Sequence, residues 1–154
     1  MQSFTRKNIR LNNFEYKSGY VYFVTICTFL KKNHFRDTSL VNTVESNIDF
    51  RINNSEIDLY CYCIMPNHIH LLLRLNKGYT GKLTDWISAF KRFISKEAKQ
   101  NFGIQSLWQR NYYDHVLRDE ESIVKVGEYI LNNPVRKNMV KEWQDYPFSK
   151  LYAK

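Results

Sequence analysis

The chain has 154 residues, 44% of them hydrophobic, which is enough for one domain with a sizeable core and excludes a wholly disordered protein. The net charge is +8 and 16% of the residues are aromatic, a combination that favours a nucleic acid partner because phosphates attract cations and bases stack on rings. No apolar run reaches the roughly 20 residues that cross a bilayer, and the basic arm at 1–18 has no secretory signal pattern. We therefore expect a single cytoplasmic domain over residues 1–154, with a tail at 134–154 and no membrane partner.

Composition and apolar periodicity predict seven elements in chain order: a strand at 20–30, a helix at 38–50, strands at 57–65 and 68–75, a helix at 84–100, a strand at 107–117 and a helix that begins after residue 119. Pro66 and Asn67 separate the second and third strands so closely that these should form an antiparallel hairpin. Thr38 is a candidate cap of the first helix, and Asp119 of the last. Pro134 should end the last helix, because the residue before a proline is pushed out of the helical region.

The element order β-α-β-β-α-β-α is that of a split βαβ unit with one helix added. It predicts an α+β, ferredoxin-like fold, in which helices pack on one face of an antiparallel sheet and an extra C-terminal helix follows. The apolar face of the second helix should consist of Trp86, Phe90, Phe93 and Ile94.

The three cysteines favour reduced, structural thiols. Cys61 and Cys63 share one face of a strand, a spacing that does not suit an ordinary disulfide. A zinc site needs four ligands in paired clusters, and with Cys27 the chain has only three cysteines.

His68 and His70 lie one residue apart in a predicted strand. Side chains alternate along a strand, so the two imidazoles project from the same face roughly 6 to 7 Å apart, and Ile69 points to the core. They could hold one metal ion together, or they could be ordinary strand residues. Two ligands are too few for a tight site, so a third ligand would have to come from elsewhere.

Tyr129 and Asn133 are four residues apart in the predicted last helix, which places them one turn apart on one face. An asparagine oxygen suits a hard cation, and Gly127 would allow close approach of a ligand or backbone. Taken alone, Tyr129 could equally be a packing residue and Asn133 a helix C-cap.

The chain resembles the single-tyrosine HUH transposases, where HUH stands for histidine, a bulky hydrophobic residue and histidine, and most of all the REP-associated tyrosine transposases. The resemblance covers nearly the whole chain, in family order, through "IRL" at 9–11, "GYVYFVTICT" at 19–28, "MPNHIHLLL" at 65–73, "LWQRNYYDHVLRDEES" at 107–122 and "YILNNPVR" at 129–136.

The resemblance implies a metal-dependent endonuclease and strand transferase that forms a covalent 5′-phosphotyrosine. His68 and His70 match the family's metal ligands, and Tyr129 matches its nucleophile. Asn133 matches the third metal-binding position, where some relatives have glutamine, which leaves the exact coordination open. Mg²⁺ or Mn²⁺ is the expected cofactor.

The implied partner is single-stranded DNA, often folded into hairpins, and a homodimer is an arrangement that the resemblance leaves open. Basic residues that could contact the DNA are Arg6, Lys7, Arg10, Lys91, Arg92, Lys96, Lys99, Arg110, Arg136 and Lys137. Each could instead be a solvated surface charge. His115 could be a further ligand or proton shuttle, or a hydrogen-bonding strand residue.

Two other functions fit the same composition. A non-catalytic or domesticated nucleic-acid-binding protein would share the fold and charge but form no covalent bond. A metal-dependent phosphoesterase would use activated water and would not need Tyr129.

Overall fold

The computed structural model describes residues 19–152, so Arg6, Lys7 and Arg10 of the basic arm lie outside the described residues. The strands are β1 (Val21–Cys27), β2 (Ile57–Met65), β3 (His68–Leu75), β4 (Tyr113–Leu117) and β5 (Ser149–Leu151). The α-helices are α1 (Thr38–Asn53), α2 (Leu83–Phe102), α3 (Glu120–Leu131) and α4 (Asn133–Arg136). None of these helices is both long and apolar enough to span a bilayer.

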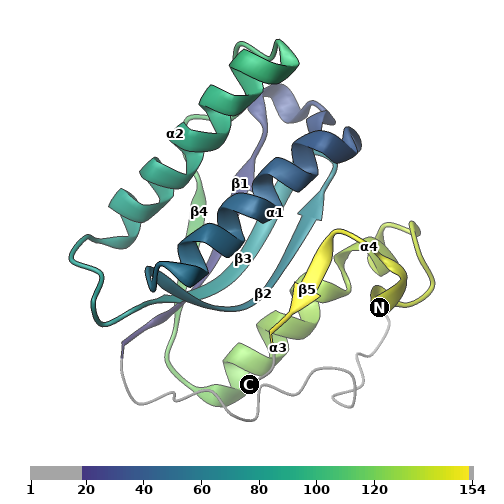
Figure 1. The fold of residues 1–154 in the computed structure, drawn as a ribbon. Coiled ribbons are helices and arrows are strands. Elements are labelled where there is room, and N and C mark those ends of the chain that lie inside the picture. Colours follow the sequence, from purple (N-terminus) through teal and green to yellow (C-terminus); the bar gives the residue numbers. More distant parts are fainter. Residues whose placement is uncertain (1–18, 153–154) are drawn as a thin grey trace.

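The strands form one sheet in the order β4-β1-β3-β2-β5, with antiparallel neighbours throughout (Figure 1). The first four strands follow the order expected of a split βαβ unit, and the predicted α+β, ferredoxin-like fold is confirmed. The predicted antiparallel hairpin of β2 and β3 is present, with Met65 opposite His68 across Pro66 and Asn67.

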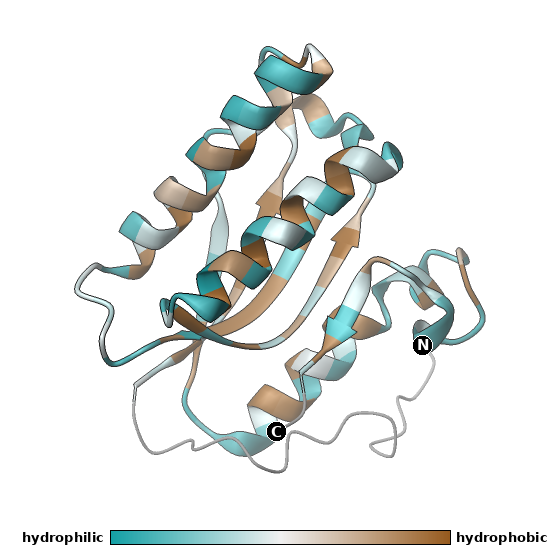
Figure 2. Ribbon diagram, in the orientation of Figure 1, coloured by the Kyte–Doolittle hydropathy of each residue, from teal (hydrophilic) through white to brown (hydrophobic). Residues whose placement is uncertain are grey.

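One face of the sheet is covered by α1 and α2, which run side by side (Figure 1). Their apolar stripes enclose one hydrophobic cluster with Ile69, Leu71 and other strand residues of the same face. Figure 2 shows the hydrophobic residues concentrated along the central strands and in stripes on the helices. Ile69 points into this core as predicted, so its neighbours His68 and His70 point to the other face.

The other face of the sheet is covered by α3, which packs against β2 and β3. Ile123, Ile130 and Leu131 of α3 form a second cluster with Cys61 and Cys63 of β2. All three cysteines are free, and burial raises the pKa of Cys61 and Cys63 well above the usual range. These two thiols are therefore neutral packing groups.

Several predicted boundaries differ in the structure. Asp37, rather than Thr38, caps α1, because its carboxylate accepts a hydrogen bond from the Ser39 backbone N–H. Asp119 does cap α3 as predicted, accepting from the Ser122 N–H.

The predicted apolar face of α2 is buried except at one residue. Phe93 is 42% exposed, whereas Trp86 and the other predicted residues of this face are buried.

The predicted strand at 107–117 is shorter than expected, because β4 begins at Tyr113. Trp108 makes only an isolated bridge with Thr28. The Trp108 indole N–H donates to the Lys91 backbone carbonyl, while the Lys91 ammonium group donates to the carbonyls of Gln109 and Arg110. Residues 107 and 109 still bond to the backbone of residues 29 and 27, but the bridge of Thr28 to Trp108 is out of register with the pairing of β1 and β4, so the strand is interrupted.

Pro134 does not end the last helix. The helix α3 ends earlier, at Leu131, with Asn132 as its C-cap, and Pro134 lies in the first turn of the short helix α4. Proline is tolerated there because the first backbone N–H groups of a helix have no partner within the helix. Tyr129 and Asn133 therefore belong to two successive helices, not to one.

The C-terminal tail adds the edge strand β5, which the sequence did not predict. It pairs with β2, and the Tyr146 hydroxyl donates to the Ile64 carbonyl over 2.6 Å. Aromatic side chains of the tail thus pack on the sheet.

Candidate functional site

The site is built on the tip of the β2–β3 hairpin, which backbone and hydroxyl contacts hold in place. The Thr28 backbone N–H donates to the Asn67 backbone carbonyl over 2.9 Å, and the Thr28 hydroxyl lies 3.0 Å from that carbonyl and 2.8 Å from the carbonyl of Lys32. The Phe35 N–H donates to the Pro66 carbonyl. These contacts fix the residues that directly precede His68.

The two imidazoles converge on the face that α3 covers. The ring centroids of His68 and His70 are 4.7 Å apart. Nδ1 of His68 lies 2.7 Å from Asn67 Oδ1, and Nδ1 of His70 lies 2.8 Å from Thr25 Oγ1. Because Asn67 Oδ1 can only accept, His68 carries its proton on Nδ1 and has a lone pair on Nε2.

Both imidazoles are neutral at pH 7. Burial lowers the pKa of His68 to about 4, and the charges of Lys137 and Lys31 act in the same direction. Burial also lowers the pKa of His70 to about 3, with contributions from His68 and Arg136. A neutral imidazole has a lone pair available to a metal ion, so the environment keeps both side chains in their ligating form.

The metal-free protein is expected to lose stability as the pH falls below 6.5. The unfolded chain protonates His70 near pH 6.5, whereas the folded chain resists protonation down to about pH 3, so the unfolded state binds more protons between these values. This stabilisation is complete above pH 6.5 and is lost, by up to about 1.4 kcal/mol per pH unit for one imidazole, as the pH falls. Urea unfolding in EDTA at pH 7, 6 and 5 measures the decrease, which should be smaller in His70→Gln; an equal decrease in both proteins contradicts it.

Tyr129 lies on α3 beside the histidine pair, in the same chain. Its ring centroid is 6.2 Å from that of His70, and 45% of the residue is exposed. The Phe23 ring of β1 packs against both, with centroids 5.4 Å from His70 and 6.1 Å from Tyr129. The tyrosine ring is therefore held next to the imidazoles and remains accessible to a substrate.

Asn133 reaches the same place from the start of α4. It is buried, and its Nδ2 lies 3.0 Å from His68 Nε2. The amide group thus donates to the lone pair that a cation would use. Rotation of the amide by half a turn would present its oxygen instead, so the three side chains fit a cation that accepts nitrogen and oxygen ligands.

Further ligands of the usual types are not close. Within residues 19–152, no three His, Cys, Asp or Glu side chains cluster closely enough to hold a metal ion. His115 is on the histidine face, because it pairs with Phe23, but β1 separates its strand from β3. The structure thus places His115 one strand away from the imidazole pair.

A basic cavity of about 550 Å³ adjoins His68. Lys31, Arg36 and Lys137 line it, together with Asn67 and hydrophobic side chains. Of these three cations, only Lys137 is among the DNA contacts predicted from the sequence. Lys31 was missed because the sequence around it has no regular pattern. Only the structure shows that its backbone is unusual for a residue other than glycine, with a positive φ of 52°.

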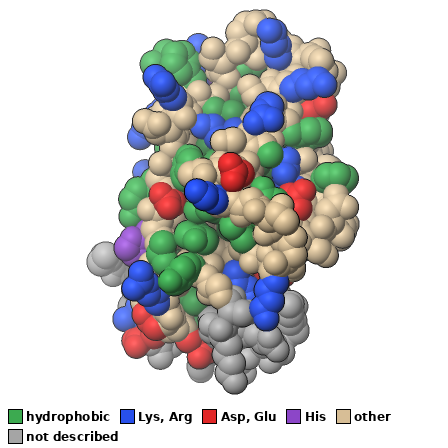
Figure 3. Space-filling view, turned by 90° about the vertical axis from the view of Figure 1, so that its left-hand side faces the viewer, with side chains coloured by type: hydrophobic (Ala, Val, Ile, Leu, Met, Phe, Trp, Pro, Cys, Tyr) green, Lys and Arg blue, Asp and Glu red, His purple; other side chains and the backbone are tan. Residues whose placement is uncertain are grey.

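The predicted DNA contacts on α2 lie apart from the histidines. Arg92, Lys96 and Lys99 line a cavity of about 710 Å³ on α2, which packs on the opposite face of the sheet. Arg110 is exposed, but the Lys91 ammonium group is bound to backbone carbonyls. Figure 3, which views the molecule from the α2 side of Figure 1, shows Lys and Arg side chains interspersed with hydrophobic ones.

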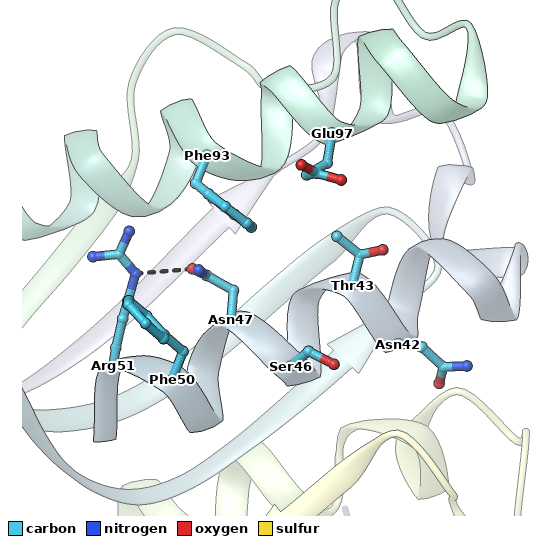
Figure 4. A pocket seen from close by; sticks show the side chains of 8 residues that line it. All are labelled: Asn42, Thr43, Ser46, Asn47, Phe50, Arg51, Phe93 and Glu97. Carbon is cyan, nitrogen blue, oxygen red and sulfur yellow. Dashed lines mark hydrogen bonds between the residues drawn. The ribbon is translucent and has the colours of Figure 1, made fainter. Parts of the chain in front are cut away.

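A further cavity of about 560 Å³ lies between α1 and α2 (Figure 4). Phe50 and Phe93 line it from the two helices, and Arg51 donates to Asn47 at its base. The exposure of Phe93 is explained by this cavity. This cavity too lies on the face of the sheet that α1 and α2 cover, away from the imidazoles.

Thr25, Asn67 and Phe23 support the site and were not predicted from the sequence. Phe23 and Thr25 are two residues apart on β1, which indicates that they share a face. Only the pairing of β1 with β3, which sets Thr25 opposite His70, shows that this is the histidine face.

Known proteins share both sequence and fold with the chain. The family described as "Transposase IS200 like" matches residues 15–133. An uncharacterized protein of Haemophilus influenzae is 31% identical over 161 residues, covering 84% of this chain and 88% of that protein. A REP-associated tyrosine transposase of Escherichia coli is 27% identical over 92 residues, covering 60% of this chain and 53% of that protein.

A solved structure of a REP-associated tyrosine transposase bound to a REP hairpin has a TM-score of 0.67 to the chain. The match covers 92% of this chain and 82% of the chain in that structure, at 21% sequence identity, and so shows a shared fold. The family match spans the stretch from β1 to Asn133, which includes both histidines and Tyr129. The resemblance to single-tyrosine transposases, and to the REP-associated ones in particular, is confirmed, and the chain belongs to the family of IS200-like transposases.

Proposed function

We propose that this transposase cleaves and rejoins single-stranded DNA at or near a hairpin, through a covalent bond between Tyr129 and a 5′ phosphate. The observation that carries the proposal is the Tyr129 ring, which lies 6.2 Å from the His70 ring and is accessible to solvent. Because nucleophile and imidazoles belong to one chain, a single protomer has the groups that one cleavage needs.

We further propose that His68, His70 and Asn133 hold a divalent cation. Both Nδ1 atoms have hydrogen-bond partners within the protein, which leaves the two Nε2 atoms and the Asn133 amide oxygen as ligands. Oxygen and nitrogen ligands suit Mg²⁺ or Mn²⁺, and imidazoles favour Mn²⁺ in vitro. When bound, the cation would supply positive charge beside the scissile phosphate.

The proposed step is an in-line displacement at phosphorus. The Tyr129 phenolic oxygen forms a bond to phosphorus and loses its proton to solvent, while the bond to the 3′ oxygen breaks and that oxygen takes up a proton. The products are a 5′-phosphotyrosine and a free 3′-hydroxyl. Since the new phosphodiester retains the energy of the old one, a second 3′-hydroxyl can reverse the step and join two strands.

The basic cavity beside His68 is where we propose that the DNA strand next to the cleaved bond lies. Its three cations, Lys31, Arg36 and Lys137, can neutralise phosphates, and its hydrophobic lining can contact a base. The related structure bound to a REP hairpin supports a hairpin as the folded part of the substrate.

The function can be tested with a pool of hairpin oligonucleotides whose single-stranded flanks are randomised, incubated with the protein and Mn²⁺. A 3′ label should migrate with the protein on a denaturing gel, whereas a 5′ label should be released on a fragment ending in a 3′-hydroxyl, and EDTA should abolish both. Binding that ignores EDTA and yields no adduct would indicate a non-catalytic protein. Cleavage without an adduct would indicate an activated water as the nucleophile.

A further inference from the structure

Arg136 makes two contacts with Tyr129. Its guanidinium carbon lies 3.9 Å from the centroid of the Tyr129 ring, and its Nη1 donates to the Tyr129 carbonyl over 2.8 Å. Arg136 is one of the cations predicted from the sequence as candidates to contact DNA. In the structure its planar cation instead covers the ring of the proposed nucleophile.

Both contacts of Arg136 span the break between α3 and α4. Seven residues separate Arg136 from Tyr129, which on one continuous helix would put them about two turns apart. The structure has a break here, because α3 ends at Leu131, α4 begins at Asn133, and Asn132 between them has φ −87° and ψ 4°. The short helix α4 carries both Asn133, which contacts His68, and Arg136, which contacts Tyr129.

The contact restrains a side chain that is otherwise open to solvent. Tyr129 is 45% exposed and has the Phe23 ring edge-on at 6.1 Å, while Arg136 lies over a face of its ring. An in-line attack requires the phenolic oxygen to be held in a narrow range of positions, and misplacement by about 1 Å can cost about 100-fold in rate. A guanidinium group is suited to restrain the Tyr129 ring, because it remains charged and its planar shape stacks on aromatic rings.

We propose that Arg136 is a positioning residue, which holds the Tyr129 ring in the orientation that in-line attack requires. The proposal rests on the function proposed above, since it assumes that Tyr129 is the nucleophile. It predicts that loss of Arg136 slows the chemical step and leaves DNA affinity nearly unchanged, whereas a residue that mainly contacts phosphate would alter affinity and its salt dependence.

The test compares Arg136→Ala and Arg136→Lys with Arg118→Ala. Arg118 is a matched control, because its guanidinium also lies over a tyrosine, 5.5 Å from the Tyr20 ring, but away from the site. At saturating DNA and Mn²⁺, the single-turnover rate of adduct formation should fall about 10- to 100-fold in Arg136→Ala, less in Arg136→Lys and not in Arg118→Ala. Added guanidinium ions should restore part of the Arg136→Ala rate.

Two further measurements separate positioning from DNA binding and from folding. The dissociation constant for DNA, measured with Tyr129→Phe in both backgrounds, should change less than about 2-fold when Arg136 is replaced. A 3-fluorotyrosine at position 129 should show a shifted and broader ¹⁹F resonance in Arg136→Ala but not in Arg118→Ala, with neither DNA nor metal present.

An unchanged rate and resonance in Arg136→Ala would overturn the proposal, as would a loss confined to DNA affinity. If Arg136→Ala unfolds, Arg136→Lys and the ¹⁹F resonance of the folded variant decide the question. A wild-type protein that forms no adduct at all, but whose ¹⁹F resonance responds to Arg136, would leave the positioning contact standing and refute the proposed function instead.

Discussion

Replacing Tyr129 by phenylalanine is expected to reduce covalent attachment to DNA by at least about 1,000-fold, because the variant lacks the only oxygen of this side chain that can attack phosphorus. The ring itself is retained, so its contacts with Phe23 and Arg136 should persist. DNA binding and thermal stability should therefore stay close to those of the wild type. Denaturing gels with a 3′-labelled hairpin oligonucleotide measure the adduct.

The matched control is Tyr20→Phe, which removes the hydroxyl of a similarly exposed tyrosine that is distant from Tyr129 in the sequence. Tyr20 is 54% exposed and contacts Arg118. Its adduct formation should equal that of the wild type. Tyr113 is the other exposed tyrosine near Phe23, with ring centroids 6.0 Å apart. Attachment that survives in Tyr129→Phe and disappears in Tyr113→Phe would transfer the nucleophilic role to Tyr113.

Replacement of His68 or His70 by alanine should weaken Mn²⁺ binding at least about 100-fold and reduce adduct formation to a similar degree. Each substitution removes one of only two imidazoles on this face close enough to share a cation. Isothermal titration calorimetry measures the affinity directly. Mn²⁺ should also raise the unfolding temperature of the wild type but not of either variant, because a ligand that binds only the folded state stabilises it.

His115→Ala serves as the comparison for this experiment, since His115 shares the histidine face but lies beyond β1. Its Mn²⁺ affinity should match the wild type. Loss of Mn²⁺ binding in His115→Ala would show that the chain rearranges to bring a third imidazole to the cation. Adduct formation that continues in the His68 and His70 variants, and in EDTA, would contradict a catalytic role for a metal.

The β2–β3 hairpin is the part of the fold that the sequence predicted to the residue, at 57–65 and 68–75. Its signals are local, because β-branched and apolar runs meet a two-residue break, and alternation then assigns the histidines to one face. The roles proposed for Tyr129 and Asn133, as nucleophile and third ligand, came from the family resemblance, which the comparisons have confirmed at the level of the family.

Elements whose ends depend on distant partners were predicted less well. The predicted strand at 107–117 is interrupted, because the bridge of Trp108 to Thr28 is out of register with the pairing of β4 and β1, while Lys91 bonds to the carbonyls of residues 109 and 110. The strand β5 exists because β2 offers it a free edge. Neither interaction has a sequence pattern, since each joins segments that are far apart in the chain.

The sequence by itself determined the type and order of most elements, and the common face of His68 and His70, because hydrophobic periodicity and strand alternation act over a few residues. Only the tertiary structure decided that α3 covers that face, that Thr25 and Asn67 hold the imidazoles, and that Arg136 lies over Tyr129. The physical reason is that these contacts depend on strand register and on how α3 and α4 pack against the sheet, which the whole fold fixes.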